Sequence, residues 1–217
     1  MKNWIFWVGF LLAIWGQASP PLLAQGADEE LSRVRTAIEA GRWIEARARL
    51  ERLIRERPEW PEARLMRMEV YLRLGMLEEA EQEGNALRSW GENRPDFWTL
   101  LGDVYAAHGR WDAAYEAYQQ GRERDPQNRT LLLRLGHAAL WIEAFEPARQ
   151  AFEAVLRTRP TDPEAHYGLA RLEALRGRPE AALAHLRICF EQGWIQPDAI
   201  RNDPVFAAVV RLPGFPR

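Results

Sequence analysis

Residues 95–128 read PDFWTLLGDVYAAHGRWDAAYEAYQQGRERDPQN, and this stretch decides the fold. Its first half places four residues on one helical face: Trp98, Leu101, Gly102 and Tyr105. Such spacing is typical of an amphipathic α-helix that packs against a neighbour. Gly109 then predicts a turn, because glycine adopts left-handed backbone angles without a steric penalty. A second helix follows and ends at Asp125, since the residue before Pro126 avoids the helical region.

The marks of this helix pair recur every 34 residues along almost the whole chain. The turn position holds Gly41, Gly75, Gly109, Glu143 and Gly177. The position where the two helices approach closely holds Ala46, Ala80, Ala114, Ala148 and Ala182. The pattern predicts five copies of the pair, over residues 27–60, 61–94, 95–128, 129–162 and 163–196.

The period and the residues at fixed positions resemble the tetratricopeptide repeat family. The copy at residues 95–128 has the family's marks at Trp98, Leu101, Gly102, Tyr105, Ala114, Tyr118 and Pro126. The resemblance implies an all-α fold: a right-handed α-solenoid of about five antiparallel helix pairs over residues 27–196. It also implies a protein that binds partners rather than transforming them.

Two copies depart from the pattern. Gly84 stands where other copies place a bulky residue in the second helix, and we expect Trp90 to fold into the gap. The alternatives for Gly84 are local repacking and a hinge or pocket. Glu143 replaces the turn glycine of the fourth copy, so we expect the preceding helix to end without a left-handed residue.

Both ends of the chain differ from the repeats. Residues 1–24 have the pattern of a secretory signal peptide, with Lys2 ahead of an apolar run over residues 4–15 that is too short to span a bilayer. We expect cleavage after Ala24, with Ala18 as the second choice. An uncleaved anchor formed by residues 4–24 is the alternative. Residues 197–217 predict a short helical cap whose apolar side chains cover the last repeat: Val205, Phe206, Val209 and Val210.

The composition gives no indication of a catalytic, metal or cofactor site. Net charge is −2, without the strongly basic balance expected of a nucleic-acid-binding protein. Cys189 is the only cysteine and lies on the inner face of a predicted helix, where we expect a buried small side chain. The histidines show no metal-ligand spacing: His108, His137, His166 and His185. We therefore expect no cofactor and no bound metal.

The resemblance implies that the first helices of successive repeats line a concave groove. In its C-terminal half, five apolar or aromatic residues would form one patch: Leu133, Leu140, Trp141, Tyr167 and Leu175. His137 and Arg171 would add polar anchors. Such a patch usually marks an interaction site. We expect a protein or peptide partner there; coverage by the C-terminal cap or by a second copy is the alternative, and the oligomeric state stays open.

Members of the family that clamp a peptide carboxylate use lysine and asparagine in the groove. The matching positions here hold Leu31, Arg35, Leu65 and Glu69, which disfavours that mode. The sequence thus predicts a non-catalytic scaffold, exported to the periplasm or cell envelope of a bacterium, that contacts the membrane only through its signal peptide. The alternatives are an inner-membrane-anchored assembly factor for an envelope export or biogenesis complex, and an enzyme or cofactor carrier.

Overall fold

The computed structural model of the chain describes residues 22–216, and within this range every regular element is a helix. Five helix pairs follow one another: α1 (Leu22–Glu39) and α2 (Trp43–Glu56), α3 (Pro61–Arg73) and α4 (Leu77–Gly91), α5 (Pro95–Ala107) and α6 (Trp111–Arg124), α7 (Arg129–Trp141) and α8 (Phe145–Thr158), α9 (Pro163–Leu175) and α10 (Pro179–Glu191). Three short elements follow: α11 (Pro197–Arg201), η1 (Pro204–Phe206) and α12 (Ala207–Val210). The all-α solenoid expected from the sequence is confirmed.

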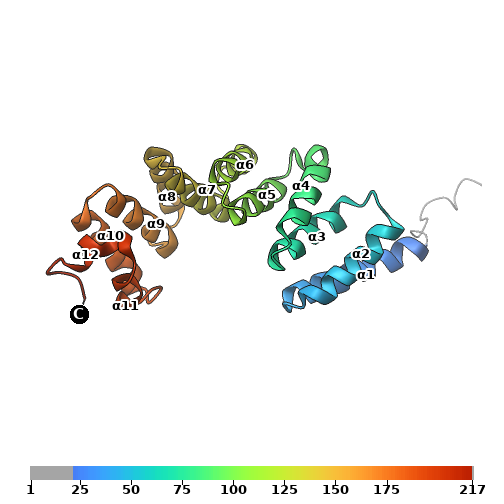
Figure 1. The fold of residues 1–217 in the computed structure, drawn as a ribbon, viewed down its shortest axis with the longest axis horizontal. Helices are drawn as coiled ribbons and strands as arrows, with labels where there is room; N and C mark the ends of the chain where they lie inside the picture. Colours follow the sequence, from blue (N-terminus) through green and yellow to red (C-terminus); the bar gives the residue numbers. More distant parts are fainter. Residues whose placement is uncertain (1–21, 217) are drawn as a thin grey trace, which may run out of the picture.

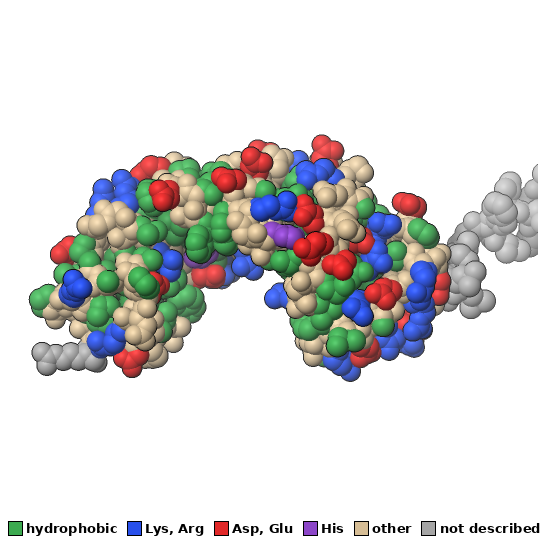
Figure 2. Space-filling model, in the orientation of Figure 1, with side chains coloured by type: hydrophobic (Ala, Val, Ile, Leu, Met, Phe, Trp, Pro, Cys, Tyr) green, Lys and Arg blue, Asp and Glu red, His purple; other side chains and the backbone are tan. Residues whose placement is uncertain are grey.

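The pairs lie side by side along an arc, with α1 at one end and the C-terminal elements at the other (Figure 1). The space-filling view shows that the arc is hollowed on the side between its two ends (Figure 2). The expected signal peptide falls almost wholly on residues 1–21, outside the described residues, and its removal stays a prediction. Helix α1 begins at Leu22, so the expected cleavage site after Ala24 lies inside this helix.

Each turn between the two helices of a pair closes in the same way. Gly109 has φ +73°, and the amide of Arg110 donates to the Tyr105 carbonyl at 2.9 Å. This is the hydrogen bond of a Schellman motif, and it requires one left-handed residue. The other turn glycines have similar positive φ values: Gly41, Gly75 and Gly177.

Glu143 also adopts the left-handed conformation, with φ +57°, and the amide of Ala144 donates to the Ala139 carbonyl at 2.8 Å. Our expectation that this helix ends without a left-handed residue is therefore wrong. The packing of α7 against α8 requires the same turn as in the other repeats. That packing outweighs the roughly 1–2 kcal/mol that the left-handed conformation costs a residue with a Cβ.

Close approach of the helices within each pair depends on small residues. All five alanines of the repeating column are fully buried: Ala46, Ala80, Ala114, Ala148 and Ala182. At Gly84 an added Cβ would lie 2.7 Å from Leu101 Cδ1 and 3.1 Å from Met68 Cε. The space at this glycine is thus filled by Met68 and Leu101, and our expectation that Trp90 fills it is wrong. These two long, flexible side chains project from the neighbouring helices α3 and α5 and occupy the space beside Gly84.

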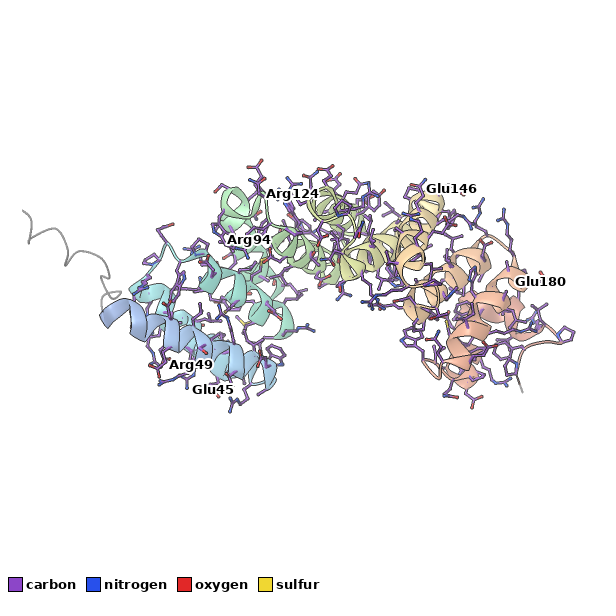
Figure 3. All side chains as sticks on the ribbon, turned by 180° about the vertical axis from the view of Figure 1, so that it is seen from behind. Glu45, Arg49, Arg94, Arg124, Glu146 and Glu180 are labelled. Carbon is purple, nitrogen blue, oxygen red and sulfur yellow. The ribbon has the colours of Figure 1, made fainter. Side chains whose placement is uncertain are left out.

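The core continues from repeat to repeat and into the C-terminal elements. Ile200, Phe206 and Val209 are buried against Leu183 and Leu186 of α10. These C-terminal residues therefore cover the side of the last helix pair that has no further repeat to pack against. At the other end, the outer helix α2 has a surface ion pair between Glu45 and Arg49 at 3.0 Å, and both residues lie on the same side of α2 (Figure 3).

Candidate partner-binding groove

The first helices of the pairs line one open groove of about 1640 Å³ on the hollowed side of the arc. Helices α1, α3, α5, α7 and α9 each contribute residues, and Val205 of η1 closes the C-terminal end. The elements run in the same order along the groove as along the chain, because each repeat packs on the next. The floor contains one residue from each repeat at the same position: Arg35, Glu69, Asp103, His137 and Arg171.

The two halves of the groove differ in chemistry. The N-terminal half is mixed: the charged residues Arg35, Glu62, Glu69, Arg73, Arg94 and Asp96 line it together with Leu65, Met66, Leu72 and Leu100. The C-terminal half is mostly apolar and aromatic and is lined by Trp111, Leu140, Trp141, Phe145, Tyr167 and Leu175. A segment that filled the groove would therefore meet charged and aliphatic groups at one end and mostly aromatic and apolar groups at the other.

Six of the seven site residues predicted from the sequence line this groove: His137, Leu140, Trp141, Tyr167, Arg171 and Leu175. Trp141 and Leu175 are 61% and 46% exposed, whereas Leu140 is buried, with 7% of its surface exposed. Leu133 does not line the groove, and its place in the predicted patch is wrong. It is buried in the core beside Leu169 and Phe152, because α7 is enclosed by its own partner α8 and by the next repeat.

The C-terminal end of the groove is partly occupied by the chain itself. The Tyr167 ring lies 5.8 Å from the Phe206 ring and 5.4 Å from the Trp194 ring, centroid to centroid. Arg171 forms an ion pair with Asp203 at 3.0 Å. Arg171 is therefore already paired and is not the free polar anchor expected from the sequence. Its ion pair connects α9 to Asp203, the residue that precedes η1. The open part of the apolar surface lies around Trp141 and Leu175.

Trp111 is a groove residue that the sequence argument missed. It begins α6, and its ring stacks on Trp141 at the end of α7 with centroids 4.9 Å apart and planes 8° apart. The two rings meet because the start of α6 and the end of α7 lie on the same rim of the groove. A pattern in the sequence could have identified this residue, because a bulky side chain stands two positions after the turn residue in each of the first four copies. These residues are Trp43, Leu77, Trp111 and Phe145.

A hydrogen-bonded network fixes the middle of the floor. The Tyr118 hydroxyl donates to Asp103 at 2.6 Å, and Arg134 forms an ion pair with the same carboxylate at 2.9 Å. Burial raises the pKa of Tyr118 well above its ordinary value, so the hydroxyl stays a donor. His137 packs edge-on against Phe152, and burial lowers its pKa. The floor thus offers a neutral imidazole and a satisfied carboxylate rather than reactive groups.

The single cysteine and two of the histidines, which are residue types that can take part in chemistry, lie in or beside the core. Burial raises the pKa of the Cys189 thiol to about 11, and its Sγ lies 3.2 Å from the Pro163 carbonyl oxygen. Nδ1 of His166 lies 3.0 Å from Nδ1 of His185. Within residues 22–216, no group of three side chains could hold a metal ion, and no helix is long and apolar enough to cross a membrane.

Comparisons with known proteins agree with this architecture. A family model described as "Tetratricopeptide repeat" matches residues 37–104, 105–172 and 143–188, which together span most of the chain. No curated protein sequence matches the chain.

Several solved structures share the fold. TTC0263, a TPR protein from Thermus thermophilus, is 22% identical with a TM-score of 0.63, over 86% of this chain and 100% of that one. A tetratricopeptide repeat protein from Parabacteroides merdae is 17% identical with a TM-score of 0.73, over 86% of this chain and 73% of that one. A crystal structure of MamA is 15% identical with a TM-score of 0.66, over 74% and 94% of the two chains. At these identities the likeness concerns the fold alone.

Proposed function

Because the chain belongs to the tetratricopeptide repeat family, we propose that it is a non-catalytic scaffold that binds a protein or peptide partner in its concave groove. The observation behind this proposal is the exposure of Trp141 and Leu175 on the open groove wall. Large exposed apolar side chains in a concave surface are typical of interaction sites, and tryptophan is a common hot-spot residue. We place the protein in the bacterial cell envelope on the basis of the signal-peptide pattern in residues 1–24.

The size of the groove supports a peptide-sized occupant. A helix about 11 Å wide that rises 1.5 Å per residue fills roughly 140 Å³ per residue. The groove of about 1640 Å³ therefore has room for about three helical turns of a partner, or for an extended segment of similar length. Amphipathic helices and extended segments both bind in such grooves through a few anchor side chains.

Site-specific photo-crosslinking in cells tests the proposal. A photoreactive residue replaces Thr99, which lines the groove, so that Trp141 stays in place, and a control probe replaces Glu116 on the outer helix α6. We expect one protein adduct at position 99 that is absent at position 116, and mass spectrometry then identifies the partner. Equal adducts at both positions, or none at position 99, would contradict groove binding.

The second candidate is an inner-membrane-anchored assembly factor for an envelope complex. It is favoured by the start of α1 at Leu22, ahead of the expected cleavage site, so that an uncleaved apolar segment would lead directly into the first repeat. N-terminal sequencing of the protein purified from its host separates the two candidates. A mature chain that begins at Gln25 or at Ser19 supports the exported form, whereas a chain that begins at Met1 supports the anchored form.

A further inference from the structure

We infer that the groove rim formed by Trp111, Trp141 and Glu143 binds the guanidinium group of an arginine carried by the bound partner. This inference rests on the groove binding proposed above and specifies one part of the partner's chemistry. We call these three residues the rim site. Three independent features favour a planar cation there: an open indole face, an unpaired carboxylate, and helix ends that lack basic residues.

The first feature is the indole face. Trp111 covers one face of Trp141 through the near-parallel stack, which fixes the orientation of the Trp141 ring. Trp141 is nevertheless 61% exposed, so much of the ring remains open to a ligand. Tryptophan is the best aromatic partner for a cation, and a guanidinium stacks flat on such a ring.

The chain's own arginines show that a guanidinium over an aromatic ring is a common contact in this molecule. Arginines lie over many of its aromatic rings, the closest being Arg94 over Trp90 at 4.3 Å. The other rings covered in this way are Trp43, Trp60, Tyr71, Trp98, Tyr105, Tyr167 and Phe215. Among residues 22–216, no arginine lies over Trp111 or Trp141. The rim site thus lacks the cation that neighbouring aromatic rings obtain from within the chain.

The second feature is Glu143. Its side chain lines the groove, and it forms no ion pair within the described part of the chain. It also occupies a left-handed backbone position that the other four repeats give to glycine. A strained residue of this kind often marks a functional position. The carboxylate places negative charge two residues from the open indole.

The third feature is the pair of helix ends. Helices α5 and α7 end at Ala107 and Trp141, both of which line the groove. The C-terminus of a helix has a partial negative charge, which a basic residue in the last turn usually complements. Neither helix has one in its last turn. The nearby Arg110 and Arg176 are engaged by Glu81 and Glu146 respectively, so they do not neutralise the rim.

The test uses two synthetic peptides, acetyl-Leu-Arg-Leu-amide and acetyl-Leu-citrulline-Leu-amide, which have nearly the same shape but differ in charge. Each is titrated into the purified protein while the indole N–H signals are followed by NMR. We expect the arginine peptide to shift the Trp111 and Trp141 signals saturably, with an affinity at least fivefold higher than that of the citrulline peptide. Equal affinities for the two peptides, or no shift with either, would overturn the inference.

Matched variants show whether the rim site is responsible. Glu143→Gln removes the charge with little change in shape, and Trp141→Leu removes the stacking surface. Each should lower the affinity for the arginine peptide at least threefold, whereas Glu116→Gln on α6 should leave it unchanged. Circular dichroism confirms that each variant is folded. Undiminished binding by either rim variant would contradict the assignment.

The outcome is separable from that of the proposed function. The peptide titration needs no knowledge of the natural partner, whereas the crosslinking experiment captures that partner directly. A groove adduct at position 99 combined with equal binding of the two peptides would reject the rim site and leave the scaffold function standing. Arginine-selective binding without a cellular adduct would support the rim site and count against partner binding in the cell.

Discussion

A single residue, Glu143, shows how the repeat architecture can override local preference. The neighbouring repeats place glycine at this turn, and the fourth copy takes the same left-handed turn with a glutamate. The sequence identified the position but predicted the wrong conformation. Local preference disfavours φ > 0 for a residue with a Cβ, whereas the packing of α7 on α8 depends on contacts far from the turn.

We expect Glu143→Gly to raise the free energy of unfolding by about 1 kcal/mol, because it removes the left-handed strain. Urea denaturation followed by circular dichroism measures this change. Gly109→Ala provides the matched control, since it introduces the same strain at an equivalent turn and should lower stability by a similar amount. If Glu143→Gly left stability unchanged or reduced it, the turn would not be strained.

Two half-buried histidines predict a pH dependence of stability. Burial lowers the pKa of His137, and burial together with the neighbouring His166 lowers that of His185. The unfolded chain then binds protons near pH 6.5 that the folded chain does not. Stability should therefore be complete above pH 6.5 and fall as the pH is lowered below it. Glu173 and Arg149 also face His185, and their opposite charges act on its pKa in opposite directions.

Denaturation at pH 7.5 and pH 5.5 measures this loss. The range from pH 5.5 to pH 7.5 lies above the titration of three carboxyl groups whose pKa values are lowered below their ordinary values of 3.8 and 4.5. These groups are Asp96, Asp162 and Glu173. The variant His137→Gln should show a smaller difference between the two pH values than the wild type. An identical pH dependence in the variant would show that His137 does not contribute.

At the scale of helices, the sequence predicted more of the fold than of the site. Five pairs and their turns follow from a fixed period and from glycine chemistry, which are local properties. Which face of a helix reaches the groove depends on how many neighbours enclose it. Helix α7 has three consecutive buried leucines, Leu131 to Leu133, because other helices surround it on most sides. The stack of Trp111 on Trp141 joins two repeats, so no single copy of the pattern contains it.

The C-terminal elements give a prediction at this scale. Phe206 is fully buried against α10 and contacts the Tyr167 ring. Phe206→Ala should lower the free energy of unfolding by about 3–4 kcal/mol, since it removes a buried aromatic ring and leaves a cavity. Thermal or urea denaturation measures the loss, and the exposed Arg211→Ala serves as control. A loss below about 1 kcal/mol would show that the last repeat does not need this cover.

At the scale of the whole molecule, stability and binding reside on different surfaces. Each repeat contacts its neighbours, and the core is a succession of five buried clusters from α1 to α12. Stacking of the repeats also forms the groove wall, whose exposed side chains contribute little to the packing of the core. The curvature that opens the groove accumulates from small rotations between repeats, which the sequence pattern alone does not specify.

This separation leads to a prediction about function without loss of fold. In the double variant Trp141→Ala, Leu175→Ala, a photoreactive residue at Thr99 elsewhere in the groove should capture at least tenfold less partner than in the otherwise unchanged protein. Stability should fall by only about 1 kcal/mol, from the lost ring stack. Leu133→Ala should behave oppositely, costing about 2–5 kcal/mol as a buried leucine while leaving the groove wall intact in the folded fraction. Unchanged capture by the double variant would mean that the partner binds elsewhere on the solenoid.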